Sequence, residues 1–261
     1  MKRLFVLILV LSLLLCACGE DKPVSEVTPQ TNPTTEATAA PTTEPTTEPT
    51  AAPTTEPTTE PTTAPTTEPA PTEADLSFGR IEGGVYTNTY AGIGCEMNTN
   101  WSFYSAEELQ ELPELTNGVI KGSELGKLTE KYTQFFDMQA ENVTDLLAVN
   151  VVYVKIGMQE RLLYAVMSEE QTIDEVLKLK DLMIQSYAQA GIEVTSMEKT
   201  KVMFMGEEHY AIRTEASTQG IPIYMVQIGN YKLGAYGMTL TATSYLVDKT
   251  QNVLDMFYPV E

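Results

Sequence analysis

Apolar and polar positions divide the chain into three regions with different patterns. Leu4 to Leu15 is an almost continuous apolar run, and residues 23–73 carry very few apolar side chains larger than alanine. From residue 79 onward, apolar residues alternate with polar ones or recur at helical spacing. Alternation is typical of half-buried strands and helical spacing of amphipathic helices, so only the third region is predicted to fold around a core.

Alternating, β-branched segments separated by glycines or polar turns predict the strands of this region. They cover residues 85–88, 92–97, 133–140, 146–156, 193–205, 210–216, 222–229 and 232–243. The short turns between the later segments favour antiparallel neighbours, because a parallel connection needs a long crossover.

Three helices are predicted between and after these strands. Ser105 and Glu108 form a capping box that begins a short helix ending before Pro113. Residues 116–131 are predicted as loop with a possible helical turn. An apolar stripe from Ile173 to Tyr187 predicts a long helix over 172–190, capped by Thr172 and closed by Gly191, and a last helix is expected over 249–257. Residues 76–261 are therefore predicted as an α+β domain in which an antiparallel sheet of about six strands is flanked by helices.

The N-terminus has the anatomy of a secretory signal peptide. Met1-Lys2-Arg3 is basic, and the apolar run after it is too short to cross a hydrocarbon core of about 30 Å. It ends in Leu15-Cys16-Ala17-Cys18-Gly19, which resembles the lipobox of bacterial lipoproteins. The alternative is an ordinary signal peptide with an incidental cysteine.

The lipobox resemblance implies a cellular location for the mature protein. Cleavage between Ala17 and Cys18 would remove residues 1–17 and leave Cys18 as the first residue, with a diacylglycerol on its sulfur and a further acyl chain, such as palmitate, on its amino group. Two acyl chains are enough for stable anchoring. The lipid bilayer is thus the first expected partner, with the domain anchored to the cell membrane on its extracytoplasmic face.

Residues 18–75 are predicted to be a disordered linker. Most of this segment is Pro, Thr, Glu and Ala, with the repeat PTTE. Such a composition cannot bury enough apolar area to offset backbone ordering, and frequent proline favours extended polyproline II. The linker is interpreted as a semi-rigid stalk with a reach on the order of 150 Å, or as a passive spacer.

Composition excludes several classes of function. The chain carries 36 acidic and 16 basic residues, a formal net charge of −20, and the segment from Asp75 to Glu261 alone carries 26 and 13. Nucleic-acid binding is not expected, because it needs clustered Lys and Arg. With three cysteines and one histidine in the whole chain, neither a disulfide framework nor a His/Cys zinc site is expected, and no metal or cofactor is predicted.

The folded region resembles the PsbP-like group. The segment YTNTYAGIGCEMNTNW, the amphipathic helix at 172–190 and the Gly-led strand MGEEHYAIRTE carry this resemblance. Asn100 stands before Trp101 where the group usually has proline. The resemblance implies a PsbP-like α/β/α sandwich that binds or docks onto other molecules rather than catalysing a reaction.

Few residues are candidates for catalysis. Cys95 lies in an alternating strand and is interpreted as a buried, inert thiol, although contact with His209 would make a cysteine nucleophile conceivable. His209 is expected at the surface near a hairpin turn. Glu207 and Glu208 are adjacent on a strand and should point to opposite faces, which is awkward for joint acid–base work.

Aromatic residues are the candidates for binding. They would line a groove for a sugar or peptide, or else pack as core residues and cross-strand pairs. The set is Trp101, Tyr104, Tyr224, Tyr231 and Tyr236.

Three hypotheses of function follow. The leading one is a non-enzymatic surface lipoprotein whose domain binds an envelope protein or glycan. The second is a cell-envelope hydrolase that uses carboxylates or Cys95. The third is an accessory subunit of a membrane complex, which predicts an exposed apolar patch on the sheet or on a helix.

Overall fold

The computed structural model describes residues 76–261. The predicted signal peptide, the cleavage site between Ala17 and Cys18, the lipid attachment at Cys18 and the linker lie outside the described residues. Within the described residues, no helix has the length and apolar character needed to span a membrane.

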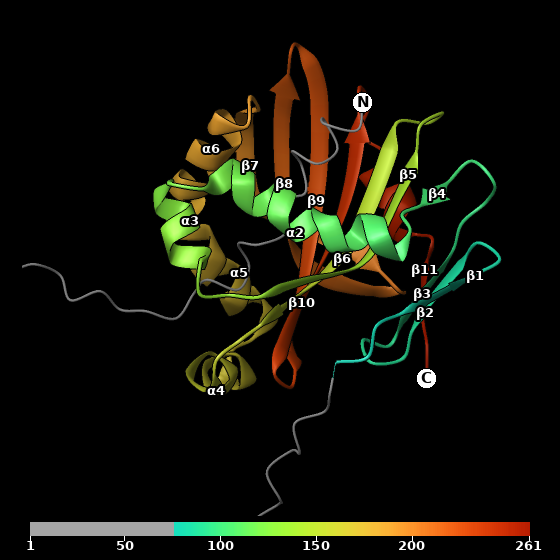
Figure 1. Cartoon of the computed structure of the whole chain (residues 1–261), viewed down its shortest axis with the longest axis horizontal. Coiled ribbons are helices and arrows are strands. Elements are labelled where there is room, and N and C mark those ends of the chain that lie inside the picture. The colour runs from blue at the N-terminus through green and yellow to red at the C-terminus, as the bar shows by residue number, and fades with distance from the viewer. Residues whose placement is uncertain (1–75) are drawn as a thin grey trace, which may run out of the picture. The chain divides into compact units, whose positions relative to one another are not determined.

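A seven-stranded antiparallel sheet forms the centre of the domain (Figure 1). Its order is β4-β5-β6-β10-β9-β8-β7. The strands are β4 (Ser102–Phe103), β5 (Gln134–Asn142), β6 (Leu147–Lys155), β7 (Glu193–Phe204), β8 (Glu207–Thr218), β9 (Ile221–Leu233) and β10 (Tyr236–Tyr245). Neighbouring strands from β7 to β10 are joined by tight turns, which accounts for their antiparallel pairing.

A smaller, four-stranded antiparallel sheet has the order β1-β2-β3-β11. Its strands are β1 (Arg80–Glu82), β2 (Val85–Asn88), β3 (Ile93–Glu96) and β11 (Phe257–Pro259). The last strand brings the C-terminal end of the chain beside β3, where Phe257 pairs with Cys95.

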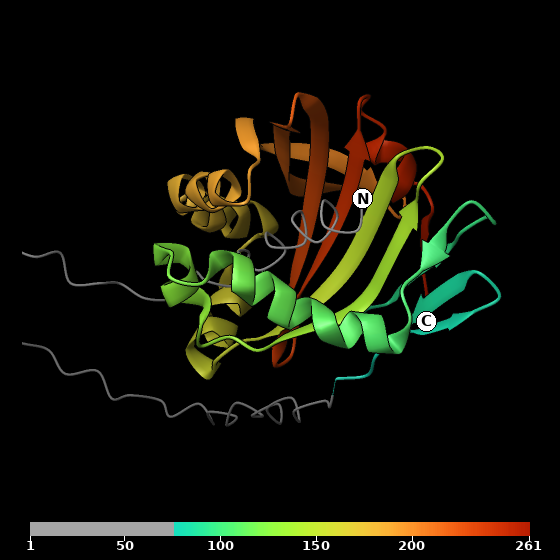
Figure 2. The same cartoon turned by 45° about the horizontal axis from the view of Figure 1, so that its top comes forward.

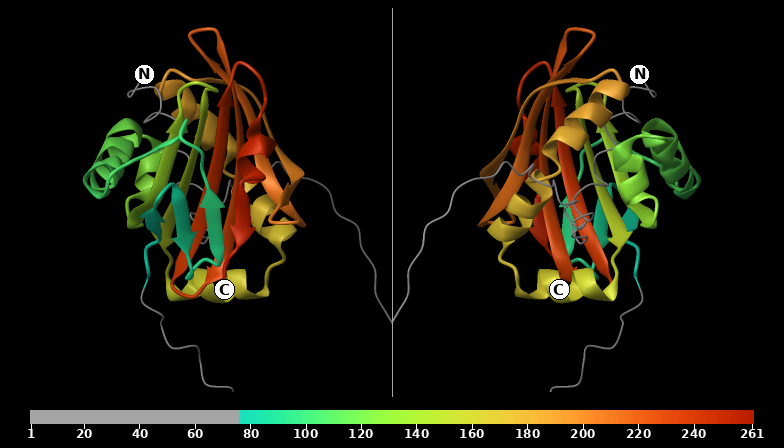
Figure 3. Two further views of the ribbon diagram at one scale, coloured as in Figure 1. Left: turned by 90° about the vertical axis from the view of Figure 1, so that its right-hand side faces the viewer. Right: turned by 90° about the vertical axis from the view of Figure 1, so that its left-hand side faces the viewer.

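The two faces of the large sheet are covered differently (Figures 2 and 3). One core joins the sheet to the helices from α2 to α6, and the other joins it to the small sheet and α7. The helices are α2 (Ala106–Ile120), α3 (Glu124–Thr129), α4 (Met158–Val166), α5 (Glu169–Leu177), α6 (Lys180–Gln189) and α7 (Thr250–Leu254). Alternation along β6 divides its side chains between these cores, with Val152 and Val154 on the helical side and Val151 and Tyr153 on the other.

The predicted α+β class and antiparallel pairing are confirmed, and every predicted strand is present with its ends moved by a few residues. The predicted sandwich with helices on both faces is only partly right, because a second sheet, together with α7, covers one face. The predicted helix over 249–257 is only partly right, since α7 ends at Leu254 and Phe257 begins β11. The helix ends at Leu254 because the residues after it pair with β3, a strand that is far away in the sequence.

The first helix confirms its predicted start and overturns its predicted end. The Ser105 hydroxyl accepts a hydrogen bond from the Glu108 amide at 3.2 Å, and the Ser105 amide donates to the Glu108 carboxylate at 3.0 Å. The helix nevertheless continues through Pro113 to Ile120. Leu112, Thr116 and Ile120 are buried along one stripe, and this packing outweighs the lost hydrogen bond at proline.

The long helix predicted over 172–190 is two helices, α5 and α6, which break at Lys178 and Leu179. Its predicted cap is also wrong, because Ser168 caps α5 in a capping box with Gln171. Thr172 instead donates its hydroxyl to the Ser168 carbonyl one turn earlier. Helix α6 packs on β7, and α5 packs on both β8 and β7.

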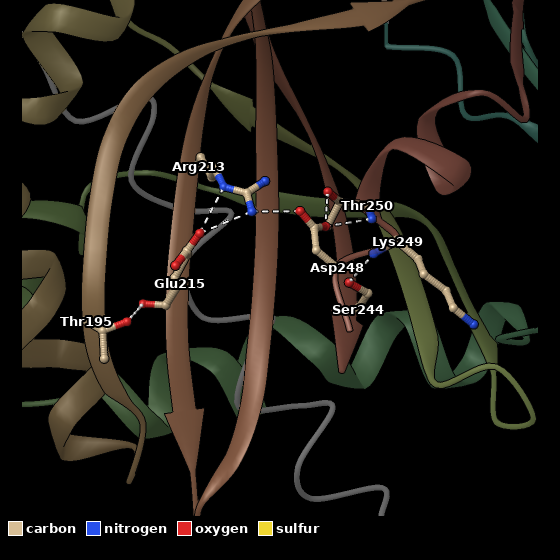
Figure 4. A network of polar contacts seen from close by, with 7 residues as sticks. All are labelled: Thr195, Arg213, Glu215, Ser244, Asp248, Lys249 and Thr250. Atoms are coloured by element: carbon tan, nitrogen blue, oxygen red, sulfur yellow. Dashed lines mark hydrogen bonds and ion pairs between the residues drawn. The ribbon is translucent and has the colours of Figure 1, made fainter. Parts of the chain in front are cut away.

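A polar network ties the start of α7 to strand β8 of the large sheet (Figure 4). The Arg213 guanidinium on β8 lies 2.6 Å from Asp248 and 3.1 Å from Glu215. Asp248 also accepts hydrogen bonds from the Thr250 amide at 3.0 Å and hydroxyl at 2.7 Å. Burial acts to raise the pKa of the Asp248 carboxyl, but the Thr250 and Arg213 contacts hold it below its ordinary value of 3.8.

Replacement of Asp248 by asparagine should reduce the acid dependence of stability. Because the carboxyl has a lowered pKa in the folded domain, its contribution is present above the ordinary value and is lost as the pH falls through the folded value. We expect Asp248→Asn to lower the free energy of unfolding by about 1 kcal/mol at neutral pH. Urea unfolding at several pH values should show the two proteins converging below pH 3.8. A constant difference across this range would contradict the assignment.

Candidate functional site

A large cavity lies at the edge of the large sheet, beneath the first half of α2. Its volume is about 690 Å³. We call it the α2 cavity, and its lining comes from three segments that are distant in sequence: Phe78, Gly79 and Ile81; Phe103, Tyr104, Ser105, Ala106, Leu109, Gln110 and Pro113; and Gln134, Phe135, Phe136 and Asp137. A cavity of this size with mostly apolar walls and a few polar groups is typical of a ligand site.

The cavity adjoins an open strand edge. β4 pairs with β5 only at Ala140 and Glu141, and the Tyr104 amide extends this contact to the Gln139 carbonyl. Over residues 134–138, no described strand pairs with β5 on this outer side. An unpaired edge can pair with another extended chain, and here the covering segment must move aside, because Gln134, Phe136, Asp137 and Met138 are at most 7% exposed.

Aromatic side chains form the cavity wall and continue into the core. Phe78 and Phe135 meet edge to face with centroids 6.1 Å apart, and Phe135 meets Tyr236 in the same way at 6.0 Å. Tyr236 in turn contacts Tyr90 at 6.4 Å. Phe78 is 52% exposed, so this row of rings reaches from solvent into the protein. The wall is thus packed against other rings on its inner side and accessible on its outer side.

Asp137 binds the segment of residues 79–88, which contributes Gly79 and Ile81 to the lining of the α2 cavity. One carboxylate oxygen accepts the Gly79 amide at 2.7 Å, and the other accepts the Tyr86 hydroxyl and the Asn88 amide group, both at 2.6 Å. Asp137 is 5% exposed. Burial raises the pKa of its carboxyl, and the three donated hydrogen bonds only partly offset this effect. The carboxylate therefore fixes residues 79–88 against β5.

The position of Asp137 depends on an irregularity in β5. The pairing of β5 with β6 shifts register between Phe136 and Met138. A bulge of this kind turns a side chain away from its regular alternation. Phe136 consequently packs with the α2 side, while Asp137 reaches Tyr86 on the small sheet.

Gln134 gives the cavity an unused acceptor. Its side chain is 7% exposed, and its carbonyl oxygen has no hydrogen-bond partner among the described residues. A buried acceptor without a partner costs about 1–3 kcal/mol. A ligand that donates a hydrogen bond to Gln134 would recover that energy.

A second cavity, of about 280 Å³, lies where the large sheet divides. β8 and β9 pair only from Ile212 and Gln227 up to their hairpin turn. Beyond this point β8 remains paired with β7 and β9 remains paired with β10, but β8 and β9 separate from each other. We call this separation the fork. We call the space the fork cavity, and Tyr231 on its wall stacks on Tyr164 of α4 with centroids 4.9 Å apart.

His209 lies in the fork and not at a turn, because the hairpin turn precedes it at Met205 and Gly206. Its side chain is 26% exposed, and its Nδ1 lies 2.9 Å from Glu169. The other oxygen of Glu169 accepts the Tyr210 amide at 3.1 Å, where β9 has diverged from β8. The pair therefore joins α5 to β8.

Cys95 contributes to neither cavity. It is fully buried, and burial raises the pKa of its thiol to about 12. Because the thiolate is the reactive form, such a cysteine is inert. His209 contacts Glu169 and Phe204, and Cys95 is sealed in the core, so the hydrolase hypothesis based on Cys95 is contradicted. Glu207 and Glu208 are both exposed at the start of β8.

The predicted binding aromatics do not share one groove. Tyr104 lines the α2 cavity and donates its hydroxyl to Glu141, while Tyr231 lines the fork cavity. Trp101 is a core residue, 9% exposed, beneath the small sheet. Tyr224 lies half-buried on β9, and Tyr236 supports the α2 cavity from behind through Phe135.

Sequence reasoning missed most of the α2 cavity, namely Phe78 and the segment Gln134 to Asp137. One signal was available in the letters QFFD, because an acidic residue within an apolar strand is rarely buried without partners. Metal chemistry finds no support in residues 76–261, where no three His, Cys, Asp or Glu side chains gather into a possible ligand set.

The sequence matches no protein-family model and no curated protein. Among solved structures, the chain is similar to the solution structure of cyanobacterial PsbP from Synechocystis sp. PCC 6803. The identity is 9% and the TM-score 0.37, over 73% of this chain and 97% of that chain. A similarity at this level supports no inference about function, which depends on the geometry of the cavities.

Proposed function

We propose that this protein is a non-enzymatic, lipid-anchored protein of the extracytoplasmic membrane face whose domain binds an extended segment of a partner protein. The observation that carries the binding role is the open edge of β5 beside the α2 cavity. The anchor is supported by the signal-peptide anatomy and by the lipobox at Leu15 to Cys18.

The mode of binding follows from the site. A peptide that pairs with β5 over residues 134–138 obtains main-chain hydrogen bonds, and every second side chain points toward one face. An aromatic or branched side chain on that face fits among Phe78, Phe103 and Phe136. The apolar walls favour such a side chain over a glycan, which needs more hydrogen-bonding groups.

Filling the cavity mouth should abolish binding of an apolar probe. Ala106 is exposed at the first turn of α2, so Ala106→Trp places a ring at the opening without disturbing the core. We expect anilinonaphthalene sulfonate to bind wild type with saturable fluorescence and the variant at least about tenfold more weakly. Fluorescence titration measures this difference.

The matched control is Leu115→Trp, which adds the same ring at an exposed position of α2 outside the cavity lining. It should bind the probe like wild type, and both variants should unfold at the same urea concentration as the parent. Equal probe binding by Ala106→Trp and wild type would reject the cavity as the site.

Pairing with the strand edge needs its own test. A synthetic peptide in which threonine and valine alternate around a central phenylalanine can be compared with the same peptide N-methylated at alternate residues. N-methylation removes the amide donors but keeps the side chains. We expect fluorescence polarisation to show binding of the first peptide and at least about tenfold weaker binding of the second. Equal affinities of the two peptides would be compatible with binding in the cavity but would exclude pairing with the strand edge.

A further inference from the structure

Helix α4 exposes an unusual apolar stripe. Met158, Leu162 and Val166 are spaced four residues apart, which places them on one face of the helix. Their exposed fractions are 74%, 67% and 81%, and Leu163 beside them is 40% exposed. Single exposed apolar residues are common, but a continuous stripe along a helix marks an interaction surface.

The buried side of α4 is fully used, so the exposed stripe is not needed to hold the helix in place. Tyr164 is fully buried and stacks on Tyr231. Glu160, the one acidic residue of α4, is 9% exposed, and it accepts the Tyr132 hydroxyl at 3.2 Å. Its carboxylate is therefore turned away from the solvent face.

Two basic residues lie beside this stripe in a domain that is otherwise acidic. Lys155 is exposed at the end of β6, just before α4, and Arg161 lies within the helix. Lys131 lies 3.7 Å from Glu160 on the buried side of α4 and offsets its charge. Residues 155–168 therefore carry two basic residues and one buried acidic residue, although acidic residues outnumber basic ones two to one in the segment from Asp75 to Glu261, with 26 against 13.

The chain enters the domain at the same end (Figures 1 and 3). Phe78 contacts Phe135, and Phe135 pairs with Tyr153 near the end of β6, from which α4 follows. The predicted linker, residues 18–75, therefore joins the domain at the end that carries α4.

We propose that α4 docks the domain onto the surface of a lipid bilayer with anionic headgroups. The apolar stripe of Met158, Leu162, Leu163 and Val166 enters the boundary between headgroups and acyl chains, and Lys155 and Arg161 face the headgroups. Entry of the tether at the same end favours a bilayer over a protein as the occupant. This goes beyond the proposed function, and only its orientation rests on the proposed anchor.

The test uses the protein without its lipid, so that docking is measured apart from anchoring. Unacylated protein of the mature length, residues 18–261 with Cys18→Ser, is sedimented with vesicles of phosphatidylcholine and phosphatidylglycerol, and with vesicles of phosphatidylcholine alone. We expect binding to the first, weakening as salt is raised, and at least about tenfold weaker binding to the second. Failure to bind either kind of vesicle would overturn the proposal without affecting the anchor, which mass spectrometry of the mature N-terminus reports separately.

Matched double variants test whether the stripe of α4 is the surface that contacts the vesicle. Leu162→Glu with Val166→Glu should weaken vesicle binding at least about tenfold. Val143→Glu with Val247→Glu makes the same change in charge at exposed positions near the opposite end of β6, and should bind like the parent. Equal binding by the two double variants, or a dimer that only the first variant dissociates, would overturn the proposal.

A fluorescence measurement reports the contact directly and does not depend on a loss of binding. Leu162→Trp should shift its emission to the blue with anionic vesicles and be quenched by brominated lipid. Val247→Trp, 61% exposed in the parent, should do neither. Quenching of both, or of neither, would reject α4 as the docking surface.

Discussion

Replacing Asp137 by alanine is expected to lower the free energy of unfolding of the domain by about 3 kcal/mol. Tyr86 and Asn88 are 0% and 1% exposed, so the donors that now reach Asp137 would lose their acceptor away from water. The Gly79 amide would lose its anchor as well. Urea unfolding followed by the fluorescence of Trp101, the single tryptophan of the chain, measures the change.

The matched control is Asp181→Ala, which removes an exposed carboxylate in the first turn of α6 and should cost less than about 1 kcal/mol. Tyr86→Phe removes one donor without leaving an unpaired one, and should fall between the two. A loss below about 1 kcal/mol for Asp137→Ala would mean that the carboxylate does not organise the wall of the α2 cavity.

Replacing Cys18 by serine is expected to abolish acylation of the protein. The thioether to diacylglycerol needs the cysteine sulfur, and two acyl chains contribute ~0.8 kcal/mol per buried methylene. Labelling with a palmitate analogue should therefore disappear in Cys18→Ser. Membranes are washed at high salt before measurement, because the contact proposed for α4 is weak and sensitive to salt.

Cys16→Ser supplies the control for this experiment. Cys16 is predicted to leave with the signal peptide, so this variant should be labelled and anchored like wild type. A mature N-terminal peptide that retains Cys16, or a Cys18→Ser protein that still carries lipid, would contradict the lipobox interpretation.

An element could be predicted from the sequence where its signal lies within a few neighbouring residues. The many β-branched residues in LLAVNVVYVKI indicated a strand, because such residues are strong β-formers and both faces of β6 are buried. Ser105 and Glu108 revealed the start of α2, because a capping box is complete within four residues. The end of α2 was missed because its stability past Pro113 depends on strands that lie later in the chain.

The α2 cavity shows the limit of local patterns most clearly. Phe78, Tyr104 and Phe135 belong to three separate segments, and none of them contains a signal that it meets the others. The aromatics chosen from the sequence were assigned to a groove or to the core by residue type alone. The fold distributes them between the α2 cavity, the fork cavity and the core.

By itself, the sequence determined the predicted address of this protein and the local identity of most of its strands, because a signal peptide, a proline-rich linker and strand alternation are properties of neighbouring residues. Only the tertiary structure decided that β2 and β3 join β11 in a second sheet and that β5 keeps an open edge. It also decided that the stripe of α4 faces solvent. These features depend on which distant segments pack together, and an amphipathic pattern does not state which surface covers its apolar face.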